Sequence, residues 1–150
     1  MFNYQTLKPL KTLEDLFSLK GRVGLIAGGA GKLACEFTRI LSQAGARIVI
    51  ADLDQKKCDS AAERLSKDSP LPVTGKACDV SQKDQVKDLF SFINREFGRL
   101  DFFISNVMGK TEDYYAPFED YPEEAWDKVM DVNLKGNFFC CKKKKKIMKK

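Results

Sequence analysis

The stretch from Val23 to Asp52 constrains the fold of this chain more than any other. It begins with the short apolar run 23–27, which is typical of a buried parallel strand. A glycine-rich turn follows at 28–34, and apolar residues at helical spacing then predict a helix that ends before Gly45. Residues 47–52 indicate a second strand that ends on a carboxylate. We therefore predict a strand–turn–helix–strand unit of the kind that binds mononucleotides.

The spacing within this unit matches a dinucleotide-binding pattern. Residues 29–34 fit G-x-G-x-x-G/A, and Asp52 lies 21 residues after Gly31, near the usual spacing of about 20. A pyrophosphate is bound by backbone N–H groups and by the positive end of a helix dipole, so the side chains at the turn must be small. Asp52 can accept hydrogen bonds from ribose hydroxyls and repels a 2′-phosphate. The binding residues expected here are Gly28, Gly29, Gly31, Lys32, Leu33, Ala34, Asp52 and Leu53. The alternative is a tight turn without a ligand, followed by an ordinary acid at a strand end.

The rest of the chain continues the alternation of strands and helices. Strands are expected at 73–78 and 100–104, the latter stopping at Ser105-Asn106, and a long helix is expected to start at Pro122. Asp54 is predicted to cap a helix that precedes the strand 73–78. Ser81 is predicted to cap the helix between the two strands, and Gly98 to end it. The resulting fold class is α/β, with a doubly wound parallel sheet and right-handed crossovers.

The apolar spacing also predicts which helix faces are buried. The helix after the glycine turn is expected to bury a stripe formed by Leu33, Phe37, Ile40, Leu41 and Ala44. The helix before Gly98 is expected to bury Val86, Leu89, Phe90, Ile93 and Phe97. Residues 13–19 are expected to form a short amphipathic turn that packs on the domain edge.

Composition bounds the class of protein. A chain of 150 residues is long enough for one domain with a core. We expect no membrane span and no secretory leader, because no apolar run approaches about 18 residues and no charged-then-apolar segment opens the chain. The chain has five cysteines without metal spacing and no histidine, so no metal site is expected. Reduced thiols favour a cytoplasmic location.

The net charge of +5 comes from the C-terminal end of the sequence. Seven of the 26 basic residues lie within 142–150, and without them 19 basic residues face 21 acidic ones. Nucleic-acid binding needs a basic surface patch, usually with aromatic platforms. We therefore expect no nucleic-acid partner.

Four motifs together give the chain a family resemblance over about residues 19–141. They are the glycine turn, Asp79-Val80 after the third strand, Ser105-Asn106 after the fourth strand, and Asn133-Leu134-Lys135-Gly136 in the long helix. The chain resembles the N-terminal part of a short-chain dehydrogenase/reductase. The resemblance implies a Rossmann-like sheet of strand order 3-2-1-4 with its C-terminal strands missing, and NAD(P)-dependent hydride transfer between nicotinamide and a carbonyl or alcohol substrate.

The resemblance also assigns roles by position. Asp79 and Val80 are implied to hold the adenine, and Asn106 with Val107 to line the cofactor. Asn133 is implied to have one catalytic role, which is to support a proton relay. Each has a structural alternative: Asp79 can cap the following helix, Asn106 can satisfy a local turn, and Asn133 needs a buried partner that the sequence does not reveal.

Departures from the family pattern qualify these roles. The usual Thr-Gly-x-x-x-Gly-x-Gly has Ala27 for the threonine, Lys32 for the middle glycine and Ala34 for the last glycine. Met108 stands where the family has a glycine, and we expect it to crowd the cofactor side of that loop.

The family's catalytic groups follow the fifth strand. The resemblance places a serine and a Tyr-x-x-x-Lys pair there, after the residues of this chain. Tyr114 and Tyr115 are not candidates for the pair, because Phe118 and Glu119 stand four places after them. We therefore expect a fragment of an enzyme that binds cofactor but is inactive alone. The alternatives are a non-catalytic NAD-binding or interaction module and a fragment of an extended-type sugar-nucleotide epimerase or dehydratase.

These expectations define the protein's organisation and partners. Residues 1–20 are assigned to an N-terminal extension, 21–141 to an incomplete NAD(P)-binding Rossmann domain and 142–150 to a lysine-rich tail. Asp52 followed by Leu53 favours NAD over NADP as the cofactor, and Lys32 is the only nearby cation that argues for NADP. The resemblance implies a small carbonyl or alcohol substrate and a homodimer or homotetramer in the complete protein.

Overall fold

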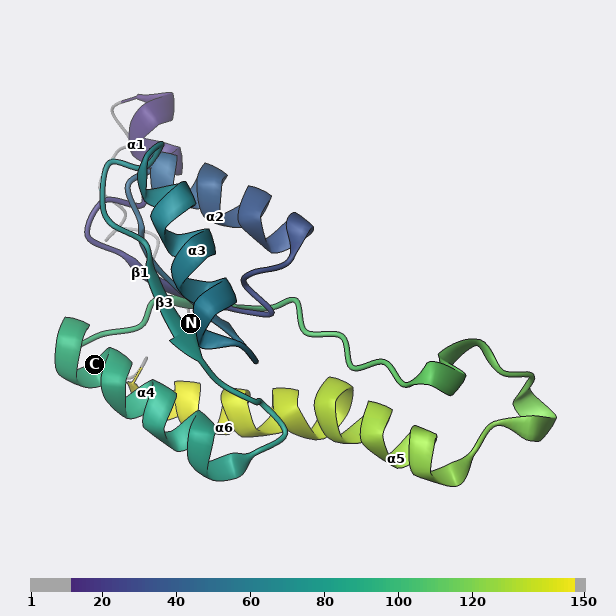
Figure 1. Ribbon diagram of the computed structural model, residues 1–150. Helices are drawn as coiled ribbons and strands as arrows, with labels where there is room; N and C mark the ends of the chain where they lie inside the picture. The colour runs from purple at the N-terminus through teal and green to yellow at the C-terminus, as the bar shows by residue number, and fades with distance from the viewer. Residues whose placement is uncertain (1–11, 148–150) are drawn as a thin grey trace.

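A four-stranded parallel sheet forms the centre of the structure, with the strands in the order β3-β2-β1-β4 (Figure 1). The structure is a computed structural model that describes residues 12–147, and side chains through residue 143. The α/β fold class and the strand order are confirmed. The strands are β1 (Val23–Ala27), β2 (Arg47–Asp52), β3 (Thr74–Ala77) and β4 (Phe102–Ser105). The two central strands have the predicted bounds, while the two edge strands are shorter or shifted by one to two residues.

Helices cover both faces of this sheet, as a doubly wound fold requires (Figure 1). Helices α2 and α3 pack on one face, and α4 and α6 pack on the other. Short turns η2 and η3 lie in the loop after β4. The bounds are α1 (Leu13–Phe17), α2 (Lys32–Gln43), α3 (Gln55–Ser66), α4 (Lys83–Phe97), η2 (Glu112–Tyr115), η3 (Phe118–Asp120), α5 (Glu123–Met130), η4 (Asp131–Gly136) and α6 (Asn137–Ile147). No helix in this described part of the chain has the length and apolar character to span a membrane.

Strand β1 is buried along its whole length, because both faces of the sheet are covered. Leu25 faces the α4 and α6 layer, whereas Ile26 faces the α2 and α3 layer. Both side chains are fully buried. Edge strand β4 differs, since Phe102, Phe103 and Ile104 are only partly buried. The two faces of β1 therefore belong to two separate apolar cores.

The predicted buried face of α2 is partly wrong. Leu33 and Ile40 are 58% and 56% exposed, and the buried positions are instead Ala34, Cys35, Thr38 and Ser42. Small side chains let the helix lie close to the sheet directly after the tight turn. The buried hydroxyls are satisfied within the helix, because Thr38 donates to the Ala34 carbonyl at 2.9 Å and Ser42 donates to the Arg39 carbonyl at 3.0 Å.

The helix ends match the sequence predictions with one exception. Asp54 caps α3 by accepting from the Lys57 N–H at 3.1 Å, and Gly98 ends α4 with a φ of 67°. The predicted Ser81 cap is wrong, because the residue before α4 is Gln82 and its side chain makes no capping bond. Ser81 instead donates to Asp79, two residues earlier.

Helices α5 and α6 are joined through the π-helical segment η4 into one long helical run (Figure 1). Pro122 precedes this run, as predicted, and α6 continues through the lysines to Ile147. Residues 106–121 lead away from the sheet to the start of α5, and we call this segment the arm (Figure 1). Residues 1–11 of the proposed N-terminal extension and 148–150 of the proposed tail lie outside the described residues.

The short turn at the beginning of the described chain does form, as α1, but it does not pack as predicted. Leu13, Leu16 and Phe17 are each more than half exposed. Leu19, just after the helix, packs against the core instead. A five-residue helix presents too little apolar surface to one side to bury all of these side chains.

Asp101 links the strand ends at the edge of the sheet away from the turn. Its carboxylate accepts from the Val23 N–H at 2.8 Å, from Arg22 at 2.9 Å and from Arg99. The hydrogen bond from Arg99, above all, lowers the pKa of Asp101 well below its ordinary value. The charged carboxylate therefore stabilises the fold at every pH at which Asp101 is also ionised in the unfolded chain.

We expect Asp101→Asn to lower the free energy of unfolding by about 1 kcal/mol at pH 7, because two of these partners are half-exposed arginines. A lowered folded-state pKa adds stability above the unfolded pKa of about 3.9, and that stability is lost as pH falls further. Urea unfolding at pH 7 and pH 3 measures this difference. The gap between wild type and variant should narrow at pH 3, and a gap that widens there contradicts the assignment.

Candidate functional site

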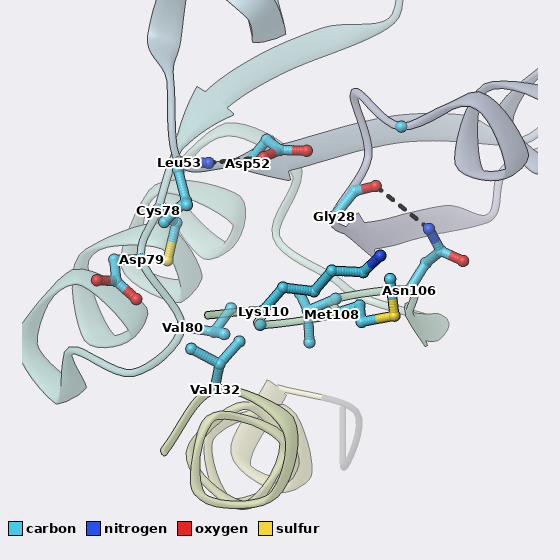
Figure 2. A pocket seen from close by; sticks show the side chains of 13 residues that line it. Gly28, Asp52, Leu53, Cys78, Asp79, Val80, Asn106, Met108, Lys110 and Val132 are labelled. Atoms are coloured by element: carbon cyan, nitrogen blue, oxygen red, sulfur yellow. Dashed lines mark hydrogen bonds between the residues drawn. The ribbon is translucent and has the colours of Figure 1, made fainter. Parts of the chain in front are cut away.

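A cleft of about 550 Å³ lies at the carboxyl ends of the strands (Figure 2). In a parallel α/β sheet this is the edge where ligands bind, at the point where strand order reverses. Here the reversal falls between β1 and β4. The cleft is lined by Gly28, Gly31, Asp52, Leu53, Cys78, Asp79, Val80, Asn106, Val107, Met108, Gly109, Lys110 and Val132.

Gly28 and Gly29 are needed by the backbone of the turn after β1. Gly28 has a φ of +70°, a conformation that other residues rarely adopt. A Cβ on Gly28 would lie 2.6 Å from the Asn106 carbonyl oxygen, and one on Gly29 would lie 2.6 Å from the Ile50 Cβ. These two glycines therefore allow the turn to pass close to β4 on one side and β2 on the other.

Gly31 differs from both, because nothing in the fold fills the space beside it. Its φ of −72° suits any residue, and a Cβ there would meet only the Gly28 carbonyl oxygen at 3.4 Å and the Asn106 amide nitrogen at 3.8 Å. Gly31 lines the cleft and is the N-cap of α2, where it offers no side-chain cap. The first N–H groups of α2 thus lack a capping side chain, which is the arrangement that binds phosphate.

Asp52 connects the turn to the end of β2. Its Oδ2 accepts from the Ala30 N–H at 3.1 Å, and its Oδ1 accepts from the Leu53 N–H at 2.9 Å. The carboxylate lines the cleft, and the Leu53 side chain beside it is 71% exposed. Figure 2 places these two residues across the cleft from Gly28 and Asn106. The carboxylate keeps lone pairs for further donors, because each oxygen holds only one of these bonds.

The segment after β3 forms the next part of the wall. Asp79 Oδ1 accepts from the Ser81 N–H at 2.9 Å and from the Ser81 hydroxyl at 2.7 Å. Its Oδ2 has no hydrogen bond within the described part of the chain. Burial, above all, raises the pKa of the Cys78 thiol to about 11. Cys78 is therefore a neutral thiol that contributes packing and not nucleophilic chemistry.

The opposite wall comes from the end of β4. The Asn106 N–H donates to the Ala27 carbonyl at 2.9 Å, and its side chain lies 3.5 Å from the Gly28 carbonyl oxygen (Figure 2). Asn106 is therefore both a local turn residue and a cleft residue. Val107 follows it along the wall, and Met108 lines the cleft with 60% of its surface exposed. The methionine has room to move away from a ligand, although it stands at the predicted place.

Asn133 has a hydrogen-bond partner that the sequence does not identify, the partly buried backbone of Gly109. Its Oδ1 accepts from the Gly109 N–H at 2.8 Å, and its Nδ2 donates to the Gly109 carbonyl at 3.4 Å. Val132 packs on the same glycine, since a Cβ there would lie 2.7 Å from the Val132 Cβ. The π-helical segment η4 thus fixes the base of the arm at the cleft. In this geometry Asn133 acts as a positioning residue.

We expect Asn133→Ala to release the backbone at the start of the arm, because the Gly109 N–H loses its acceptor. Amide exchange at Gly109 should become at least about tenfold faster, and stability should fall by about 1–2 kcal/mol. Asn133→Asp is the matched control, since it keeps an acceptor for the N–H but places a second oxygen against the Gly109 carbonyl. Exchange at Gly109 that is equally fast in Asn133→Asp and Asn133→Ala would contradict this description.

Lys110 is a cleft residue that the sequence analysis missed. It is exposed, and its ammonium group lies 3.3 Å from the Tyr115 hydroxyl and 5.4 Å from the ring centres of Tyr114 and Tyr115. In Figure 2 its extended side chain lies across the cleft, with the ammonium group in the direction of Gly28 and Asn106. No sequence pattern marks which residue of the arm returns to the cleft.

Four predicted residues do not line the cleft with their side chains. Gly29 packs behind the turn, Lys32 and Leu33 are exposed, and Ala34 in the first turn of α2 is fully buried against the sheet. Residues 32–34 can contact a ligand beside Gly31 through their N–H groups at the start of α2. Within the described residues, no group of three or more metal-ligating side chains occurs.

The described lining contains no serine or tyrosine. The phenols nearest in sequence to Lys110 are those of Tyr114 and Tyr115, and the Tyr115 side chain is 82% exposed. One Tyr-x-x-x-Lys spacing does occur in the sequence, from Tyr4 to Lys8. It precedes the first strand, unlike the family pair, and lies outside the described residues.

Comparison with known proteins agrees with this geometry. A family model described as enoyl-(acyl carrier protein) reductase matches residues 29–150. The probable NADP-dependent mannitol dehydrogenase of Yarrowia lipolytica is 34% identical over 145 residues, which are 95% of this chain and 51% of that protein. The short chain dehydrogenase/reductase dpmpG of Macrophomina phaseolina is 30% identical over 131 residues, which are 87% of this chain and 74% of that protein. The crystal structure of levodione reductase has a TM-score of 0.78 and 30% identity, covering 86% of this chain and 50% of that one.

The sheet order, the glycine turn and the strand-end acid on one cleft define a Rossmann-type α/β protein. The chain belongs to the short-chain dehydrogenase/reductase family, a family of NAD(P)-dependent oxidoreductases. It spans about half the length of the mannitol dehydrogenase and of the levodione reductase.

Proposed function

We propose that this chain provides the NAD-binding part of an oxidoreductase that transfers hydride between nicotinamide and a carbonyl or alcohol substrate. The observation that carries the proposal is the open space at Gly31 beside the uncapped start of α2, with the Asp52 carboxylate on the same cleft. A cleft with this composition accommodates a pyrophosphate and an adenosine ribose together.

The remaining lining fits the other parts of a dinucleotide. Leu53 and Val80 offer apolar surface for an adenine ring, and Asp79 Oδ2 is available to accept from its amino group. Asn106 and Val107 lie at the opposite end, where the nicotinamide would supply hydride from its C4 atom. The residues of this chain would bind and orient the cofactor and exclude water from its apolar side.

NAD is the proposed cofactor, because of the charge at the end of β2. The Asp52 carboxylate would repel a 2′-phosphate, and Leu53 brings no compensating cation. The name of the Yarrowia lipolytica relative gives NADP as its cofactor, so the preference must be tested on this chain.

We expect Asp52→Ala to narrow the preference for NADH over NADPH, and Leu53→Arg to favour NADPH by about tenfold relative to wild type. Calorimetric titration of both dinucleotides onto each variant measures this ratio. Leu53→Arg is the cleaner change, because the Leu53 side chain is exposed while Asp52 also holds the Ala30 N–H. A ratio that neither substitution alters would contradict the placement of the ribose at Asp52.

A second function is favoured by the absence of a serine or tyrosine among the described lining residues. We infer that the chain by itself is a dinucleotide-binding module and does not carry out hydride transfer.

The five cysteines are free, four of them buried, which supports the proposal of a reducing, cytoplasmic location.

A further inference from the structure

We propose that Lys110 recognises an anionic group, a carboxylate or a phosphate, on the carbonyl or alcohol substrate. This inference rests on the proposed function, because it takes the Asn106 end of the cleft as the nicotinamide end. It adds a substrate class and a specificity-determining residue to that function.

Charge distribution around the cleft is the first support. Asp52, Asp79 and Lys110 are the charged side chains in its described lining, so Lys110 provides the single positive charge. The two acids stand beside the proposed adenosine position, after β2 and β3. Lys110 follows β4, at the other end. An anion in the cleft would therefore be attracted toward Lys110 and repelled from the adenosine end.

The position of Lys110 is fixed in a way that suits recognition. The oxygen and the nitrogen of the Asn133 amide both hydrogen-bond to the backbone of Gly109, the neighbour of Lys110, which fixes the backbone at this point of the cleft. Its ammonium group has one hydroxyl partner, Tyr115, and forms no ion pair with any acid in the described part of the chain. The three donors of an ammonium group leave two for a ligand.

The surroundings distinguish a substrate from the cofactor as the source of the anion. The proposed pyrophosphate position has donors of its own, the uncapped N–H groups at the start of α2 beside Gly31. Lys110 follows Asn106 and Val107 in the chain, and its ammonium group donates a hydrogen bond to the hydroxyl of Tyr115, another residue of the arm. A substrate placed next to the nicotinamide would meet apolar Val107 and Met108 first and the ammonium group next.

The test uses the 150-residue chain with NADH bound and a pair of ligands that differ in one charge. Levulinate carries a ketone and a carboxylate, and methyl levulinate carries the same ketone without the charge. Titration followed by NADH fluorescence gives the dissociation constant of each, without requiring turnover. We expect levulinate to bind about 10-fold more tightly than its ester, the lower end of what one hydrogen bond to a charged group contributes, because Lys110 is exposed.

Two variants assign this preference. Lys110→Met should bring the ratio of the two dissociation constants to about one, and Lys110→Arg should retain most of it. Lys87→Met, which removes an exposed lysine from α4 outside the cleft, should leave the ratio unchanged.

Three outcomes overturn the inference. The acid and the ester bind equally to the wild type, the NADH-loaded chain does not bind the acid at all, or Lys110→Met weakens NADH binding itself, which would assign the cation to a cofactor phosphate. A chain that does not bind NADH would instead refute the proposed function, and the two failures are therefore distinguishable.

Discussion

Gly31→Val is expected to weaken NADH binding by about 100-fold while the melting temperature changes by no more than a few degrees. A Cβ at this position makes only ordinary contacts with the fold, and Gly31 lines the cleft, so we expect the added isopropyl group to act mainly against a bound ligand. A clash of this kind with a bound group costs about 2–3 kcal/mol, which corresponds to a factor of about 30 to 150. Calorimetry for affinity and calorimetric melting for stability separate the two effects.

Gly29→Ala, two residues earlier in the same glycine turn, is the matched control. Its new Cβ would lie 2.6 Å from the Ile50 Cβ and 2.7 Å from the Ile26 carbonyl oxygen, inside the fold and away from the cleft. We expect a loss of stability of about 1–3 kcal/mol. If the Gly31→Val protein has a much lower melting temperature but binds NADH as tightly as wild type, Gly31 is a packing residue and the prediction is wrong.

The second large effect expected is the absence of turnover by this chain alone. Oxidation of an alcohol requires a group that takes the hydroxyl proton as hydride leaves the carbon. The described cleft lining offers carboxylates beside the adenosine position and Lys110 at the far end, but no tyrosine or serine. NADH formation with a panel of secondary alcohols should stay at the uncatalysed rate. Turnover abolished by Asp52→Ala would contradict this expectation.

The same chain is expected to self-associate. Strand β4 pairs only with β1 in the described sheet, and its side chains are partly exposed. Trp126, Leu134 and Phe138 on the long helical run are each more than half exposed. Exposed apolar faces and an unpaired strand edge promote association. Light scattering at increasing concentration measures it, and a monomer that persists at high concentration would contradict the expectation.

Much of the fold could be predicted because local signals and long-range packing agree. The apolar runs 23–27 and 47–52 are buried on both faces, so their bounds match the observed strands. The positions of Gly31, Asp52 and Asn106 also follow from spacing, since each stands at the end of a strand or the start of a helix, where parallel topology brings them together.

Other features depend on contacts that no local pattern records. Leu33 and Ile40 have helical spacing, but small residues on the other face of α2 allow closer approach to the sheet. Asn133 pairs with Gly109, 24 residues earlier in the chain, through backbone groups that every residue has. Lys110 reaches the cleft because that pairing fixes the arm. Such long-range pairings are decided by the assembled fold.

Hydrogen–deuterium exchange with and without NADH tests most directly whether the dinucleotide occupies this cleft. The measurement follows the backbone of each segment and tolerates self-association. We predict slower exchange in 28–34, 52–53, 79–80 and 106–110 when NADH is bound, with no change along α4. Asp52→Ala should reduce the protection at 52–53 and in the glycine turn. Unchanged exchange at 28–34 in the presence of saturating NADH, or protection confined to the exposed groove between Phe118 and Trp126, would contradict the account.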